Sequence, residues 1–187
     1  MSKTTSNELR KSYSGIFGNQ VLLKNRNGKS VMSILPARPG KGSNVNQLKV
    51  REQFKEAVEY AVAMQKNPSL LAEYSEKATG GLTPFTLAVR DYLTPPVVKR
   101  IDTSDYHGNP GEVITVKATD DFKVRQVKIQ FISAEGNMFE EGICEYMLPE
   151  CVFRYTTTFA GRAPAGMTIK AIATDTPGNK AELSVTL

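Results

Sequence analysis

The stretch EVITVKATDDFKVRQVKIQFIS, residues 112–133, decides the fold of the C-terminal half of the chain. Side chains alternate between two faces within it, on either side of Asp120–Asp121. A period of two places neighbouring side chains on opposite faces of a β-strand, so that one face of each strand can be buried. In the two strands predicted here, one such face is formed by Ile114, Val116, Ala118, Val127, Ile129 and Phe131.

The same period of two extends outward over residues 97–187. Turn signals separate the segments at Pro110–Gly111, Glu135–Asn137 and Pro177–Asn179. Seven short strands at this spacing favour an all-β sandwich of two sheets. The predicted strands are Val97–Ser104, Glu112–Thr119, Arg125–Ser133, Met138–Cys144, Val152–Thr158, Met167–Thr174 and Ala181–Leu187.

Residues 1–95 are predicted to form an α+β module that begins with a β-hairpin. In Gly15–Leu35, Asn27–Gly28 supplies a turn with positive φ between two apolar stretches. Pro36–Ser43 contains two prolines and two glycines, so we expect an irregular connector there.

Three helices are predicted after the connector. The first extends from Val45 to Lys66, and the second and third begin at the cap-and-proline pairs Asn67–Pro68 and Thr83–Pro84. The second is expected to end at Gly80–Gly81, and Pro95–Pro96 ends the third and predicts the boundary between the two modules. The apolar stripe of the first helix consists of Val50, Phe54, Ala57, Val58, Ala61 and Met64.

Two sets of motifs carry a resemblance to known proteins. Through Pro110–Glu112, Ala118–Asp121 and Ala171–Asn179, residues 97–187 resemble the bacterial immunoglobulin-like domains of surface, adhesin and phage structural proteins. The whole chain is also similar to an uncharacterised bacterial family with a Phe-Gly-x-Gln-Val hairpin, an Asn-Gly-Lys turn, helices and an immunoglobulin-like tail; the matching residues are Phe17–Val21, Asn27–Lys29 and Val89–Leu93. The resemblance implies an immunoglobulin-like sandwich and assigns no activity.

The positive charge is concentrated near the N-terminus. Residues 1–51 hold ten Lys or Arg and the single acid Glu8, a balance of +9, whereas the whole chain has a net charge of +5. Such a segment suits an acidic partner: nucleic acid, an acidic protein surface or a neighbouring subunit. A solvated basic surface without a partner is the alternative. The residues predicted to make these contacts are Lys24, Arg26, Lys29, Arg38, Lys41, Lys49 and Arg51.

The candidate reactive residues are few. His107 is the only histidine and lies in an expected surface turn, so no nucleophile, base and orienting group can be assembled around it. One His and two Cys at this spacing match no zinc site, and neither a cofactor nor a small-molecule substrate is expected. Cys144 and Cys151 flank a tight loop and are either bridged in an oxidising environment or free.

Calcium is the metal that the predicted sandwich could hold. Asp120, Asp121, Asp175 and Asn179 lie in loops that such a fold could bring to one end. The alternative is that the aspartates cap turns through hydrogen bonds to the backbone.

The sequence therefore predicts a structural protein without catalytic residues. We expect a subunit of a filament, virion or phage-tail-like particle, in which the N-terminal module makes contacts between copies and the sandwich faces outward. The alternative is an intracellular protein that binds nucleic acid through its basic arm. The first thirty residues lack the apolar core of a secretory signal, and no run is apolar enough to cross a membrane, which predicts cytoplasmic synthesis.

Overall fold

The computed structural model describes residues 14–26, 29–35, 44–159 and 166–187, in which it places three helices and three antiparallel sheets. The chain divides into two compact units, Met1–Leu48 and Lys49–Leu187, each of which is described by itself. The connector Pro36–Ser43 and the predicted turn residues Asn27–Gly28 lie outside the described residues. The two strands on either side of Asn27–Gly28 are described, and they pair with each other.

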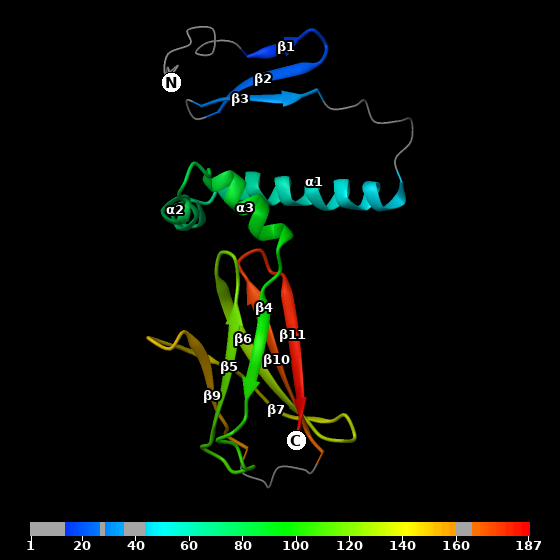
Figure 1. The fold of residues 1–187 in the computed structure, drawn as a ribbon. Coiled ribbons are helices and arrows are strands. Elements are labelled where there is room, and N and C mark those ends of the chain that lie inside the picture. Colours follow the sequence, from blue (N-terminus) through cyan, green and yellow to red (C-terminus); the bar gives the residue numbers. More distant parts are fainter. Residues whose placement is uncertain (1–13, 27–28, 36–43, 160–165) are drawn as a thin grey trace, which may run out of the picture. The chain divides into compact units, whose positions relative to one another are not determined.

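The first unit contains a sheet of three strands in the order β1-β2-β3 (Figure 1). Strands β2 (Val21–Arg26) and β3 (Lys29–Ile34) form the predicted hairpin. Strand β1 (Gly15–Phe17) was not predicted as a separate strand; β2 runs back along it after a turn in which Gly18 and Asn19 both have positive φ. Both residue types tolerate this backbone region better than most others.

The three predicted helices are present as α1 (Val45–Gln65), α2 (Pro68–Lys77) and α3 (Pro84–Leu93). The side-chain oxygen of Asn67 accepts hydrogen bonds from the backbone N–H groups of the first turn of α2, and Thr83 does the same for α3. Helix α2 ends at Lys77, three residues before the predicted Gly80–Gly81 stop.

The helices share a core with one turn of the C-terminal sheets. Phe122, between strands β5 (Val113–Thr119) and β6 (Val124–Ile132), stacks on Tyr74 of α2 with ring centroids 4.1 Å apart. Figure 1 shows α2 and α3 beside this end of the sheets. The buried residues of this core are Ala57, Ala61, Met64, Tyr74, Leu87, Ala88, Val89 and Phe122.

The remaining strands form two four-stranded sheets, ordered β11-β10-β6-β7 and β4-β5-β9-β8. All seven predicted segments between residues 97 and 187 contain a strand, and β8 is additional. The strands not yet given are β4 (Val97–Asp102), β7 (Met138–Ile143), β8 (Glu145–Met147), β9 (Val152–Thr156), β10 (Thr168–Asp175) and β11 (Lys180–Thr186).

A single core lies between these two sheets. Both contribute alternate residues to it: Ile114 and Val116 from β5, and Ile129 and Phe131 from β6, are fully buried. This is the arrangement that a β-sandwich requires. The complete set is Val98, Tyr106, Ile114, Val116, Ala118, Val127, Ile129, Phe131, Cys144, Phe153, Tyr155, Met167, Ile169, Ala171 and Ala173.

The unit from Lys49 to Leu187 includes residues on both sides of Pro95–Pro96, where the sequence predicts a boundary. Ion pairs connect the two sides: Glu73 of α2 pairs with Arg125 at 3.0 Å, and Arg90 of α3 pairs with Asp121 at 2.8 Å. That residues 97–187 form a module separate from the helices remains a prediction.

Candidate functional site

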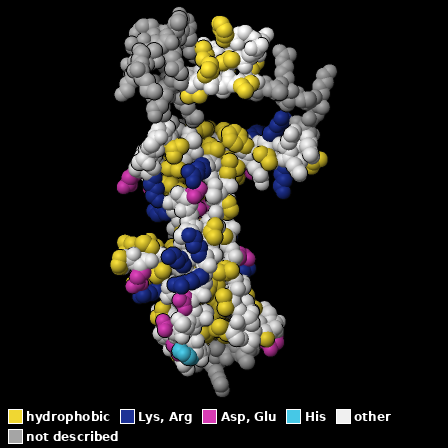
Figure 2. All heavy atoms as spheres, viewed as in Figure 1, with side chains coloured by type: hydrophobic (Ala, Val, Ile, Leu, Met, Phe, Trp, Pro, Cys, Tyr) yellow, Lys and Arg dark blue, Asp and Glu magenta, His cyan; other side chains and the backbone are white. Residues whose placement is uncertain are grey.

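One face of the three-stranded sheet is entirely apolar where its side chains are described. The strand register places Phe17, Val21 and Ile34 in one row and Leu23 and Met32 in the next. Phe17, Met32 and Ile34 are 75%, 69% and 87% exposed, respectively. Figure 2 shows hydrophobic side chains at the surface of this sheet. We call Phe17, Val21, Leu23, Met32 and Ile34 the apolar sheet face.

The opposite face of this sheet is mixed. The register places Lys24 and Ser33 on it, together with Ile16, Leu22 and Val31. Burying one large aliphatic or aromatic side chain gains about 1.5–3 kcal/mol. An exposed apolar patch built from several such residues is therefore typical of a contact surface.

A second apolar surface lies on α1. The predicted stripe continues through α1, but only Ala57, Ala61 and Met64 are fully buried, while Val50 and Phe54 are 63% and 53% exposed. Helices α2 and α3 and Phe122 cover only the C-terminal part of this stripe, so its N-terminal part is exposed.

The predicted basic residues are divided between the two compact units, and some of them lie outside the described residues. Lys24 is exposed on β2, on the face opposite the apolar sheet face. Lys49 and Arg51 are exposed on α1, in the other compact unit. The backbones of Arg26 and Lys29 lie opposite each other where β2 and β3 are joined, and Arg38 and Lys41 lie outside the described residues.

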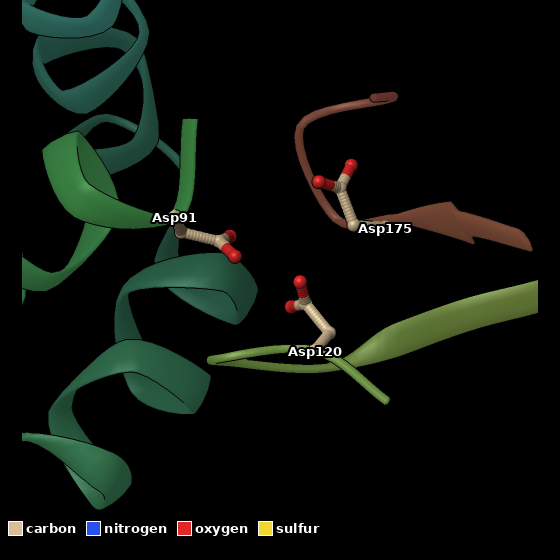
Figure 3. Close-up of side chains that lie close together, drawn as sticks. All are labelled: Asp91, Asp120 and Asp175. Carbon is tan, nitrogen blue, oxygen red and sulfur yellow. The ribbon is translucent and has the colours of Figure 1, made fainter. Parts of the chain in front are cut away.

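A cluster of three carboxylates lies where the helices adjoin the sheets (Figure 3). Asp91 comes from α3, Asp120 follows β5 and Asp175 ends β10. One carboxylate oxygen of each lies within 4.8 Å of the others. Asp91 and Asp175 are buried, and Asp120 is half-buried. We call these three residues the aspartate cluster.

Hydrogen bonds fix one oxygen of Asp91 and of Asp120 and both oxygens of Asp175. Asp120 Oδ2 accepts from the backbone N–H groups of Phe122 and Lys123, at 2.9 and 2.8 Å. Asp175 Oδ1 accepts from two N–H groups of the β10–β11 turn, and Tyr74 Oη donates to Asp91 Oδ2. Asp120 and Asp175 therefore make the turn-capping hydrogen bonds that the sequence analysis offered as the alternative to calcium.

Two further oxygens of the cluster have no partner. Asp91 Oδ1 and Asp120 Oδ1 are buried and accept no hydrogen bond among the described residues. Nor does any described Lys or Arg form an ion pair with a cluster carboxylate. Buried carboxylates in this state either hold a proton or bind a cation.

The electrostatics of the cluster reflect its burial. Burial raises the pKa of Asp91 to about 7; the hydrogen bond from Tyr74 opposes this, and the charges of Asp120 and Asp175 add to it, as does the approach of the Asp120 carboxyl group to within hydrogen-bonding range. Burial also raises the pKa of Asp175, against the lowering effect of its hydrogen bonds from Asn179 and Gly178. The site thus concentrates negative charge in a region of little solvent.

The cluster differs from the calcium residues predicted from the sequence. Asp120 and Asp175 are members, and Asn179 Nδ2 donates to Asp175 Oδ2 at 2.8 Å. Asp121 is not part of it, because its carboxylate pairs with Arg90. Asp91 was missed, although an acid three residues after the buried Ala88, on the apolar side of α3, is a signal that could have found it.

The remaining candidate residues lie apart from the aspartate cluster. Cys144 and Cys151 are free; Cys144 is buried, and burial raises the pKa of its thiol to about 12. His107 is largely exposed, with Nδ1 3.6 Å from Glu112 Oε1. Several basic side chains line a groove of 620 Å³ between α2 and the β5–β6 turn, and two of them, Lys123 and Arg125, pair with Glu73.

No protein-family model, no curated protein and no solved structure matches this chain. Among the helices in the described part of the chain, none has the length and apolar character needed to cross a membrane.

Proposed function

We propose that this chain is a structural protein without catalytic activity, and that copies of it associate through the apolar sheet face. The exposure of Phe17, Met32 and Ile34 on one face of a small sheet is the observation that carries this proposal. Three strands need a covered apolar face to be stable. A second copy brings the same face, and pairing two of them covers both.

The distribution of charge supports a second copy as the partner. Lys24 projects from the opposite side of the sheet, so pairing two apolar sheet faces does not bring these cations together. A twofold contact uses the same patch on both subunits, which requires the patch to be compatible with itself. A flat apolar surface without charge meets this requirement.

The strand order supports an immunoglobulin-like class for residues 97–187, which we propose as the displayed part of the subunit. In that class one sheet has the order A-B-E-D, and the other contains C, F and G. Strands β4, β5, β9 and β8 take the first four positions, and β6, β10 and β11 take the other three, with β7 beside β6. We propose that the chain is a subunit of a filament, a virion or a phage-tail-like particle.

The proposal is tested by measuring the size of the full chain in solution. Light scattering after gel filtration, and negative-stain microscopy, are carried out at low and high salt on the wild type and two variants. Ile34→Glu places a charge on the apolar sheet face, and Ser33→Glu places the same charge on the opposite face of the same strand. We expect the wild type and Ser33→Glu to associate, and Ile34→Glu to weaken association by at least roughly 100-fold, because an unpaired buried charge costs on the order of 3 kcal/mol or more.

Three results would contradict the proposal. If the wild type is monomeric at all concentrations, copies of the chain do not associate and the proposal is wrong. Equal loss of association in both glutamate variants assigns the effect to net charge. A monomer that shifts on DNA at low salt favours the alternative of nucleic-acid binding through the basic residues.

A further inference from the structure

The aspartate cluster is an unusual place for three acids. Asp91 has no exposed surface, and its Oδ1 atom lacks a hydrogen-bond partner among the described residues, while Figure 3 shows its carboxylate directed toward Asp120 and Asp175. Asp120 Oδ1 is also buried and lacks a hydrogen-bond partner among the described residues. These two unpartnered oxygens, from separate elements, are an observation independent of the presence of three acids.

Burial makes three adjacent carboxylates unfavourable unless their negative charge is neutralised. A buried ionised carboxylate requires a counter-charge, a bound cation or a proton. A proton shared by two carboxylates would satisfy two oxygens, but the third acid, Asp175, would still place its charge beside them. Oxygen ligands from three carboxylates at one point are instead the donor set of a hard divalent cation.

The spacing fits calcium. Oxygens bound to one Ca²⁺ lie 2.3–2.6 Å from it, so they are at most about 5 Å from one another. The three cluster oxygens lie within 4.8 Å of one another. Mg²⁺ requires near-ideal octahedral geometry at about 2.0–2.1 Å, whereas Ca²⁺ accepts less regular sets of oxygens.

We propose that Asp91, Asp120 and Asp175 bind one calcium ion, which ties α3 to the adjoining ends of both sheets. Asp120 follows a strand of one sheet, and Asp175 ends a strand of the other. The ion would neutralise the unpartnered oxygens and leave the turn-capping hydrogen bonds in place. Calcium would thereby set how firmly the helices are held on the two-sheet core.

The surrounding residues support such a site. Asn179 Nδ2 donates to Asp175 Oδ2 and to the backbone carbonyl of Tyr92, at 2.8 and 3.1 Å, which joins the β10–β11 turn to the end of α3. Tyr74 Oη donates to Asp91, and Tyr60 Oη lies 3.0 Å from Tyr74 Oη. The Tyr74 hydroxyl therefore contacts the cluster, and the Tyr60 hydroxyl lies one hydrogen bond further away.

The test uses the full chain, first stripped with a chelator. Calorimetric titration with Ca²⁺ should show one ion per chain. At a calcium concentration about 100 times the dissociation constant, Tm should rise by roughly 5–10 °C. Asp91→Asn should abolish both effects, and Asp121→Asn, which changes an acid outside the cluster, should retain both.

A second variant guards against misfolding of the first. Asp120→Asn keeps a carbonyl oxygen for the turn and removes one charge, so it should fold and lose calcium binding. Terbium gives an independent signal, because the chain has no Trp and the tyrosines beside the cluster would sensitise Tb³⁺ luminescence. Tyr74→Phe should weaken that signal while Ca²⁺ still binds.

The proposal is overturned if Ca²⁺ neither binds nor shifts Tm in the wild type, since the cluster then holds a proton or water. It is also overturned if Asp91→Asn and Asp120→Asn bind Ca²⁺ as the wild type does. Stabilisation by Mg²⁺ equal to that by Ca²⁺ would reject calcium as the ion.

Discussion

The three-stranded sheet and the two four-stranded sheets use the same alternation of side chains in different ways. In β6 from Val127 onward, and throughout β10, every second side chain is buried, because the opposing sheet covers that face. In β2 and β3 the register also gathers apolar residues on one face, but Met32 and Ile34 remain exposed. Alternation thus specifies which face is apolar, and a separate surface must provide its cover.

The largest expected difference between these regions is the effect of removing one phenylalanine. Phe131 is fully buried against the rings of Tyr106, Phe139 and Tyr155. Phe131→Ala should lower the free energy of unfolding by about 3–5 kcal/mol, through lost burial and the cavity left behind. Denaturant unfolding followed by circular dichroism measures this loss.

Phe17→Ala is the matched change in the three-stranded sheet. It should alter the unfolding of the second unit by less than about 0.5 kcal/mol, because Phe17 is exposed and lies in the other unit. It should weaken self-association in light scattering. A similar loss of unfolding free energy in both variants would show that the two regions do not differ as described.

A second prediction concerns close packing inside the two-sheet core. A Cβ atom at Gly142 of β7 would lie 2.2 Å from Cε2 of Tyr155. Gly142→Ala should therefore lower the free energy of unfolding by about 1–3 kcal/mol, because the ring must move. In a Tyr155→Leu background the same change should cost less, and an additive double-mutant cycle would contradict the proposed clash.

The features set by local sequence were predicted well. Asn67 and Thr83 accept hydrogen bonds from the backbone of the helices that they precede, as expected of cap residues followed by proline. The strands of the C-terminal half follow from alternation and turn residues. Both signals depend on neighbours a few positions away, which a sequence displays directly.

The candidate site was predicted only in part. Asp120 and Asp175 were identified as loop acids, but Asp91 is 29 residues from the nearer of them and meets them only through the packing of α3. Asp121 was assigned to the same group because adjacent residues cannot be told apart without the position of Arg90. The periodicity of α1 identifies Val50 and Phe54 as apolar stripe residues, but it does not show where the helix extends beyond its packing partners.

A third prediction tests whether the cap of α2 affects only the stability of the second unit and not the association between copies. Asn67→Ala removes the acceptor for Ser69 N and Leu70 N and should lower the free energy of unfolding by about 1 kcal/mol. Asn67→Ser keeps a capping oxygen and should recover most of the loss. Self-association should be the same in both variants, and a change there would connect α2 to the contact between copies.

The smallest expected effect depends on pH. Glu112 accepts hydrogen bonds from the side-chain amide and backbone N–H of Asn109 and from the backbone N–H of His107, which lower its pKa from 4.5 to about 2. Because the folded state binds this proton less readily than the unfolded state, Glu112 stabilises the fold above about pH 4.5. That stabilisation is lost as the pH falls toward 2.

Glu112→Gln should therefore be less stable than the wild type at pH 7, and the difference should narrow below about pH 4.5 and vanish near pH 2. Thermal unfolding of both proteins over this range measures it. Since the apolar sheet face has no carboxylate, wild type and variant should associate equally at any given pH. A difference in association that followed the titration of Glu112 would show that this end of the two-sheet core contributes to the contact between copies.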